Sequence, residues 1–302
     1  MTGSIIDRPK TAAELAIRLE DESWCTSYAF RIRWPQGFVC PACGACHPET
    51  GFQNKTLCRA CGRCSSITAG TLLHGSKKSL SIWLRALWWA SGECSSFSIM
   101  KLRNYLGFSS YQTGWAWMKK LRQIIELVNR KKCRGITLVD AAPARGPAQG
   151  NQLLVAVESI ARGRTTGRLQ MKLCQSLNQE LISQFCTDGV AGGSIVIFPR
   201  RKPFTSTHLQ EILYTVDESS PSHEDIEKIC ASYQRWRRHE KFRWPHFCCS
   251  QDLVEEFCFF HNGALTADRV DIFETLVVAA LTSQSAGLDD LTEMRAHPGG
   301  TP

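Results

Sequence analysis

The chain has 302 residues, of which 43% are hydrophobic and 21% are charged, a composition typical of globular proteins. A single hydrophobic core rarely extends over so many residues, so we expect more than one domain. The apolar stretches are too short or too interrupted to cross a bilayer, and no membrane span is expected. The start of the chain lacks the pattern of a secretory signal, so its 15 cysteines are expected in a reducing, cytoplasmic compartment.

Charge is unevenly distributed along the chain. Residues 1–135 carry 20 Lys and Arg against 8 Asp and Glu, a net of +12, and residues 136–302 carry 16 against 20, a net of −4, which together give the +8 of the whole chain. A basic first half beside an acidic second half favours binding of a polyanion such as double-stranded DNA. A basic surface that is merely solvated would have the same composition.

The first predicted element is a helix from Thr11 to about Phe30. Thr11 is suited to cap its N-terminus, and Glu14 stands at the capping-box position. A strand-like stretch over residues 31–39 follows and contains the turn sequence Trp34-Pro35-Gln36-Gly37. This stretch leads into a cysteine-rich segment.

Two matching Cys-x-x-Cys-Gly sequences then place four cysteines in the pattern of a zinc site: Cys40, Cys43, Cys58 and Cys61. Fourteen residues lie between Cys43 and Cys58. Four thiolates at this spacing form a tetrahedral zinc site, which supplies folding energy to a segment too short to bury a core of its own. Disulfides or buried free thiols are the alternative.

Three further metal-type side chains lie beside the two pairs: Cys46, His47 and Cys64. We interpret the two cysteines as spare thiols. Substitution of one of the three for a ligand is the alternative that the spacing leaves open.

Helices are predicted from Ser79 to about Asn129. The second of them ends near Leu106, Gly107 provides its C-cap, and Ser109 or Ser110 caps the next helix. A helix, a glycine-containing turn and a basic second helix are typical of a helix-turn-helix, whose second helix lies in the major groove. The candidate DNA contacts are Gln112, Thr113, Lys119 and Arg122. An ordinary helical hairpin with a charged surface is the alternative.

The pattern changes after Arg134. Strands are predicted over residues 135–140, 152–160, 167–173 and 193–198, and helices over residues 178–185, 224–239, 251–260 and 269–281. Mixed strands and helices in this order indicate an α/β core. Residues 204–218 are ambiguous, and the small, polar tail 283–302 is expected to be disordered.

These residues resemble one family. Arg33 to Phe38 running into the first cysteine pair, the second pair, Ile67 to Thr71, and the turn from Leu106 to Ser109 before Trp115 are similar to bacterial insertion-sequence DDE transposases that begin with a zinc ribbon. The resemblance is specific over about residues 20–125 and continues more faintly to about residue 282, where residues 253–262 resemble the closing helix of the family.

The resemblance implies a multidomain α+β protein with four parts. They are an N-terminal helix and zinc ribbon (1–70), a helix-turn-helix-like DNA-binding segment (71–133), an RNase H-like α/β core (134–282) and a disordered tail (283–302). Zinc would be structural in such a protein.

The family also implies catalytic acids in the second half. There, acidic residues bind two divalent ions, Mg²⁺ or Mn²⁺, which activate a nucleophile and stabilise the leaving oxygen at phosphorus. Asp140 matches the first acid, and Glu224, or second to it Glu227, matches the third. The second acid should follow the strand 193–198, where this chain has Pro199. Asp188, in a Thr-Asp-Gly sequence after a helix, is the substitute candidate.

A site that lacks one of three carboxylates holds two metals poorly, and the basic run 199–203 would repel them if it lined the same cleft. We therefore expect a transposase or transposase-derived protein that binds element-end DNA as a homo-oligomer, with impaired strand cleavage and transfer. Its expected location is the bacterial cytoplasm, on the nucleoid. The alternative is a catalytically inactive, repurposed DNA-binding regulator, so whether the protein is an enzyme stays open.

Overall fold

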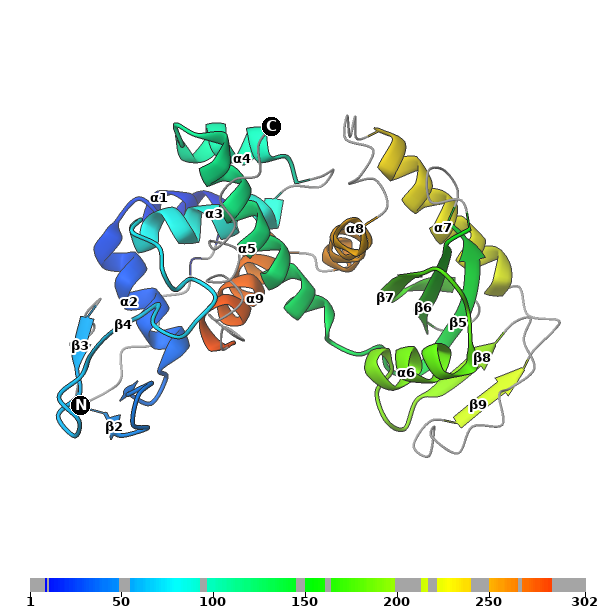
Figure 1. Cartoon of the computed structure of the whole chain (residues 1–302), viewed down its shortest axis with the longest axis horizontal. Coiled ribbons are helices and arrows are strands. Elements are labelled where there is room, and N and C mark those ends of the chain that lie inside the picture. Colours follow the sequence, from blue (N-terminus) through cyan, green and yellow to red (C-terminus); the bar gives the residue numbers. More distant parts are fainter. Residues whose placement is uncertain are drawn as a thin grey trace, which may run out of the picture. The chain divides into compact units, whose positions relative to one another are not determined.

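The computed structural model describes residues 9, 11–48, 55–92, 97–144, 150–160, 164–198, 213–216, 222–239, 250–265 and 268–283 (Figure 1). Of residues 160, 164–166, 213–216, 222–224 and 238–239 it describes the backbone only. Residues 1–91 with 273–302 form one compact unit, and residues 92–272 form a second. The predicted disordered tail lies outside the described residues apart from Ser283. The predicted four-part division stays a prediction.

Two helices, rather than the predicted one, begin the first unit. Thr11 caps α1 (Ala12–Arg18) as expected, since its side chain accepts a hydrogen bond from the Glu14 N–H. The expected continuation to Phe30 is wrong, because Asp21 starts a new helix, α2 (Glu22–Arg33), by accepting from the Ser23 N–H at 2.8 Å. A short polar side chain at this point competes with the helical backbone bonds.

Two short hairpins follow in place of the longer predicted strand. The hairpins pair β1 (Phe38–Val39) with β2 (Cys46–His47), and β3 (Lys55–Leu57) with β4 (Cys64–Ser66). The predicted strand over residues 31–39 is wrong for its first part, because α2 continues through Arg33. The hairpins are too small to bury a core, so other interactions must hold them.

Helices supply the core of the first unit. It is closed by α3 (Leu80–Gly92) and by the part of α9 (Arg269–Thr282) that begins at Phe273. Phe273 is fully buried, with its ring 5.9 Å from that of Trp88 and 6.1 Å from that of Tyr28. The Glu22 carboxylate accepts from the N–H groups of Leu80 and Ser81 at 2.9 and 2.8 Å. This anion at the start of α3 satisfies two free donors of the helix.

The helical pair of the second unit matches the prediction closely. Its helices are α4 (Ile99–Leu106) and α5 (Tyr111–Asn129). Gly107 adopts φ 67° as the C-cap of α4, and Ser110 caps α5 by accepting from the Thr113 N–H at 3.1 Å. The two helices approach closely at Gly114, where a Cβ would lie 3.1 Å from Ile99 Cγ2.

A five-stranded sheet in the order β7-β6-β5-β8-β9 forms the rest of the second unit. Its strands are β5 (Ile136–Pro143), β6 (Gln152–Ile160), β7 (Arg164–Cys174), β8 (Ile195–Phe198) and β9 (Leu213–Val216). The pairs β5–β6 and β6–β7 are antiparallel, whereas β5–β8 and β8–β9 are parallel. β9 falls in the segment that the sequence left ambiguous.

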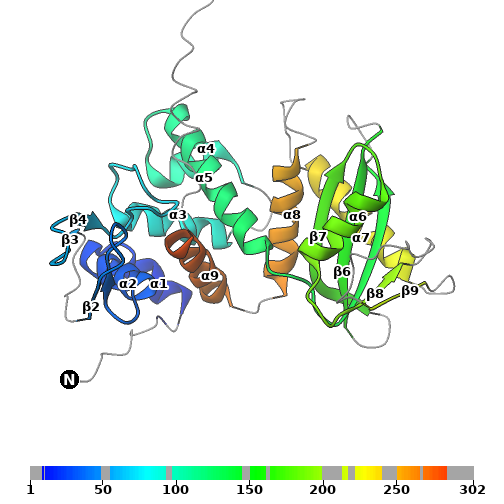
Figure 2. The same cartoon turned by 60° about the horizontal axis from the view of Figure 1, so that its bottom comes forward.

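Helices cover both faces of this sheet (Figure 2). One face of β5, with Val139, packs against α6 (Gln179–Gly189). The other face, with Leu138 and Ala142, packs against α7 (Ser222–His239) and α8 (Gln251–Ala264). Side chains alternate between faces along a strand, so Asp140 belongs to the α7 face.

Polar side chains of α8 also bond to the outer edge of β7. Asn262 accepts from the Leu169 N–H at 2.8 Å and donates to the Leu169 carbonyl at 3.0 Å. Gln251 accepts from the Leu173 N–H at 2.9 Å and donates to the Met171 carbonyl at 3.1 Å. The backbone groups that an edge strand leaves unpaired are thereby satisfied at these positions.

In the part of the chain that is described, no helix has both the length and the apolarity needed to span a membrane.

Candidate functional site

The four cysteines of the two matching sequences gather in the first unit, with all four Sγ atoms within 4.8 Å of one another. Cys40 Sγ lies 3.8 Å from Cys61 Sγ, and Cys43 Sγ lies 3.6 Å from Cys58 Sγ. A tetrahedral zinc ion with Zn–S bonds of about 2.3 Å places its sulfurs about 3.8 Å apart. The four cysteines are therefore close enough to bind a metal ion, and the donor set fits zinc.

The two cysteine turns have the same backbone structure. In each, the first cysteine donates its N–H to the carbonyl five residues later, at 2.9 and 2.8 Å. Its own carbonyl accepts from the glycine N–H: Gly44 to Cys40 at 2.8 Å and Gly62 to Cys58 at 2.9 Å. Both glycines have positive φ, 75° and 69°. The repeated glycine is thus required by the turn, where a side chain would be strained.

The neighbouring thiols are not part of the cluster. Cys46 and Cys64 are exposed, and the four cysteines are the only group of three or more metal-type ligands found among the described residues. None of the described cysteines forms a disulfide. His47 is closer, with Nε2 3.3 Å from Cys58 Sγ, where its ring can hydrogen-bond to a ligand sulfur.

Arg33 holds the second hairpin to α2, a role the sequence did not reveal. Its guanidinium donates to the carbonyls of Ser66, Ile67 and Ala69 and lies 4.5 Å from the centre of the Trp34 ring. Burial lowers the pKa of Arg33 to about 10, so the group stays charged at neutral pH. These contacts explain why arginine and tryptophan precede the first cysteine pair.

The predicted DNA contacts on α5 have different environments. Gln112 and Lys119 are exposed. The Thr113 hydroxyl lies 2.9 Å from Ser110 Oγ within the N-terminal cap. Trp115, which the sequence did not single out as a contact, lies on the same helix and is 46% exposed.

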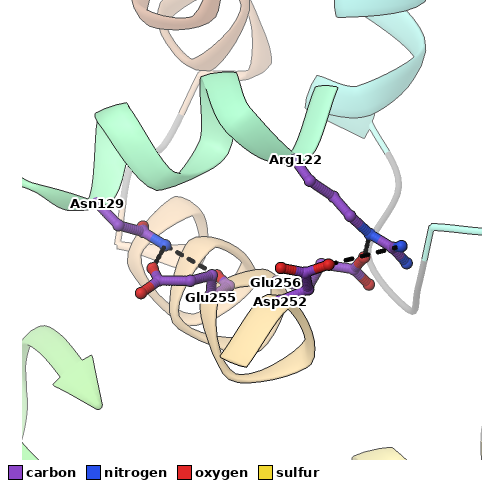
Figure 3. Close-up of polar contacts among 5 residues, drawn as sticks. All are labelled: Arg122, Asn129, Asp252, Glu255 and Glu256. Atoms are coloured by element: carbon purple, nitrogen blue, oxygen red, sulfur yellow. Dashed lines mark hydrogen bonds and ion pairs between the residues drawn. The ribbon is translucent and has the colours of Figure 1, made fainter. Parts of the chain in front are cut away.

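Arg122, the fourth predicted contact, is paired with α8 instead (Figure 3). Its Nε donates to Glu256 Oε1 at 2.7 Å, and its Nη1 lies 4.0 Å from Asp252 Oδ2. The Arg122 side chain is only 13% exposed, and that of Glu256 is 0% exposed. The structure therefore does not bring Arg122 to the exposed surface with Lys119.

A second polar contact joins the same two helices near the end of α5. Asn129 Nδ2 donates to Glu255 Oε2 at 2.6 Å and to the Glu255 carbonyl at 2.8 Å. Gln251 Nε2 donates to Glu255 Oε1 at 2.9 Å. Burial raises the pKa of Glu255, and these hydrogen bonds lower it in part. Figure 3 shows that the pairs lie along one side of α8.

A cavity of about 390 Å³ lies between α5 and α8. Its lining includes Trp115, Lys119, Arg122, Gln123, Asp252 and Glu256. An aromatic ring, cations and carboxylates thus meet around one opening in the second unit.

Asp140, the first predicted catalytic acid, is on the central strand of the sheet and only 4% exposed. Its Oδ1 accepts from the Ala141 N–H at 2.7 Å. On the adjoining helix α7, burial raises the pKa of Cys230 to about 12, and the charges of Asp140 and Glu227 add to this rise. Both carboxylates are therefore near Cys230. Glu224 lies in the first turn of α7, and its side chain is outside the described residues.

Asp188, the substitute second acid, lies elsewhere. It is exposed near the end of α6, the helix that covers the opposite face of the sheet from the Asp140 side chain. The structure does not bring Asp188 to Asp140. Strand β8 pairs Ile197 with Leu138 and ends at Phe198. The next residue, Pro199, lies with the basic run outside the described residues.

The described side chains therefore gather one group of metal ligands. The four thiols suit a single zinc ion. No group of three carboxylates is gathered among the described side chains, which do not include that of Glu224.

Comparison with known proteins adds little. No protein-family model matches the chain, and no curated protein matches it in sequence. A cryo-EM structure of a simian T-cell lymphotropic virus intasome in complex with the PP2A regulatory subunit B56 gamma is similar at 10% identity. The match covers 68% of this chain and 75% of that chain, with a TM-score of 0.28. A likeness this slight does not indicate a shared fold.

Proposed function

We propose that the protein is a transposase-derived DNA-binding protein with impaired strand cleavage and transfer. Zinc on the four cysteines would fold the ribbon, and the ribbon with the α4–α5 helix-turn-helix would bind element-end double-stranded DNA as a homo-oligomer. The expected place of action is the bacterial nucleoid. The carrying observation is a sheet whose central strand keeps one catalytic-type acid while the neighbouring strand leads into Pro199.

The order of the sheet supports an RNase H-like core. Three antiparallel strands, β7-β6-β5, are extended beyond β5 by two strands parallel to it, and helices cover both faces. That arrangement is the one expected from the resemblance to DDE transposases. Asp140 lies on its central strand, at the position expected for the first acid.

The charge of the helix-turn-helix supports DNA binding. From Cys94 to Ile125 the chain has five basic residues and no acidic one. Lys119 and Gln112 are exposed on the second helix, where they are available to phosphates and base edges. This surface would bind a polyanion whether or not catalysis survives.

The positions of the acids support impaired strand cleavage and transfer. The charges of Asp140 and Glu227 both raise the pKa of Cys230, and Glu224 lies one turn before Glu227 on the same helix. Asp188 belongs to the opposite face of the sheet, so it is a poor replacement for the acid missing after β8. Two carboxylates alone do not hold two divalent ions well.

The test is a combined binding and cleavage assay with the full-length protein. Duplex DNA carrying the terminal repeats of its element would be incubated with Mg²⁺ or Mn²⁺ and scored for gel shift and for strand cleavage, beside an Asp140→Ala variant. We expect a shift with both proteins and no cleavage above that of the variant. Cleavage that disappears with Asp140→Ala would show an active transposase, and the absence of any shift would refute DNA binding.

A further inference from the structure

The cavity between α5 and α8 is formed by residues of the second unit alone and opens beside the exposed face of α5. Its volume is about 390 Å³. Its lining includes Lys119 and Arg122 from the predicted DNA contacts, but no residue of the zinc cluster and not Asp140. A ligand that fits this cavity must suit an aromatic rim and an acidic floor.

Trp115 forms the aromatic rim. Its side chain lines the cavity and is 46% exposed, although Trp117 and Met118 on the same helix are buried in the core. An indole held on a helix and open to solvent on one side is suited to stack on a planar ring.

Carboxylates of α8 form the floor, and Arg122 on α5 holds one of them in place. Glu256 is completely buried, and Arg122 fixes its Oε1 at 2.7 Å. The Phe97 N–H also helps to lower the pKa of the Glu256 carboxyl. Asp252 is more exposed and lies 4.0 Å from the same guanidinium. Of these two carboxylates, Asp252 is the one that a ligand can reach, and it offers an acceptor for an N–H group.

Lys119 lies one helical turn after Trp115 and is exposed at the same opening. It belongs to the stretch from Cys94 to Ile125, which contains five basic residues and no acidic residue. The acids of the cavity come instead from Glu126 and from α8. A matching ligand would place an anionic group on the basic surface at the opening and an amino group inside the acidic cavity.

We propose that this cavity accepts a single unstacked DNA base. Trp115 stacks on the base, the exposed carboxylate of Asp252 accepts a hydrogen bond from its amino group, and Lys119 binds the adjoining phosphate. The inference rests on the proposed DNA binding and specifies what part of the DNA is read. A base outside the helical stack is already partly released from pairing, so an unpaired base enters at the lowest free-energy cost.

The acceptor chemistry makes the site selective among bases. Cytosine and adenine present an exocyclic amino group, from which a carboxylate can accept a hydrogen bond. Thymine presents a carbonyl oxygen at the equivalent place. A carboxylate accepts hydrogen bonds and has none to donate to the carbonyl oxygen of thymine. An unpaired cytosine or adenine should therefore bind more tightly than an unpaired thymine.

The test compares the full-length protein on three DNA duplexes: fully paired, with one unpaired cytosine, and with one unpaired thymine. The expected ratio of affinities, unpaired cytosine over fully paired, is about fivefold or more, since stacking of one base contributes about 1–3 kcal/mol. Trp115→Ala should abolish this ratio, and Trp115→Phe should keep part of it. Asp252→Asn should remove the preference for cytosine over thymine. Tyr111→Ala, an exposed aromatic one turn earlier that does not line the cavity, should leave the ratio unchanged.

Separate outcomes refute the two proposals. Tight binding to paired DNA with the same affinity for all three duplexes would overturn the base pocket and leave DNA binding intact. A ratio that Trp115→Ala and Tyr111→Ala lower equally would also overturn it. If Trp115→Ala instead changes the oligomeric state measured by light scattering, without altering the ratio, the face binds a second copy. Failure to bind any duplex refutes the proposed function together with the pocket.

Discussion

Glu256 is a carboxyl group that folding removes from water. Its side chain is fully buried, and burial raises its pKa to about 7, although the charge and the hydrogen bond of Arg122 lower it. Desolvation therefore exceeds the attraction of the ion pair, as is common for buried pairs. The pair specifies which faces of α5 and α8 meet more than it adds to stability.

Because folding raises the pKa of Glu256, the free energy of unfolding depends on pH. The unfolded chain releases the Glu256 proton near its ordinary pKa of 4.5, whereas the native protein keeps it until about pH 7. The native state binds more protons in this window, so the contribution of Glu256 is fully present below pH 4.5 and is lost as the pH rises to about 7. The loss should be about 3 kcal/mol relative to a Glu256→Gln variant. Urea unfolding of both proteins at the two ends of the window measures it.

Other titrating groups are common to both proteins and cancel in the comparison. A difference between wild type and Glu256→Gln that does not change with pH would contradict the prediction. A difference that changes in the opposite direction would mean that Arg122, and not burial, controls the carboxylate.

At the scale of elements, we expect the ribbon to depend on a metal. Its hairpins have two or three residues in each strand, and the four cysteines are brought together between them. Such strands cannot persist by their own pairing. Metal binding and folding of this segment should therefore occur together.

Single cysteine variants test this coupling. Cys43→Ser removes a ligand and should abolish or greatly reduce zinc binding and increase proteolysis of the ribbon. Cys46→Ser, which changes an exposed cysteine outside the cluster, should retain one zinc per chain. Zinc content of the purified proteins measures the first effect, and limited proteolysis with and without a chelator measures the second. Loss of zinc in Cys46→Ser would show that the ligand set is different.

Local chemistry is what the sequence predicted well. The caps formed by Thr11, Gly107 and Ser110 depend on side chains within three or four residues, and the structure confirms them. The break at Asp21 was missed because the apolar pattern continues through it. The pairing of Arg122 with Glu256 joins residues 134 positions apart, so no local pattern indicates it.

At the scale of the whole molecule, positive charge is concentrated in the first part of the chain and the acids of the sheet lie in the second. The net of +12 in residues 1–135 contrasts with −4 in the rest, and on α5 the Lys119 side chain is exposed. The sequence predicted this division, but it could not decide which cations are free. That depends on ion pairs made on folding, such as Arg130 with Glu126 at 3.0 Å.

Salt dependence distinguishes free cations from paired ones. The affinity for DNA should fall linearly with salt on logarithmic axes, with a slope of about 0.9 for each phosphate contact. Lys119→Ala should reduce the slope by about one contact, whereas Arg130→Ala, on the same helix but paired with Glu126, should leave it nearly unchanged. Fluorescence anisotropy at several salt concentrations measures both slopes. Equal changes in the two variants would contradict a role for Lys119 as a phosphate contact.

The bonds from Asn262 and Gln251 to β7 mean that a helix takes the place of a sixth strand. An uncovered strand edge is a template on which other chains add, and here side-chain amides occupy its donors and acceptors. The same helix holds α5 through Glu255 and Glu256 on its other side. Shortening the protein before α8 would therefore leave a sheet open to growth, and the shortened protein should aggregate.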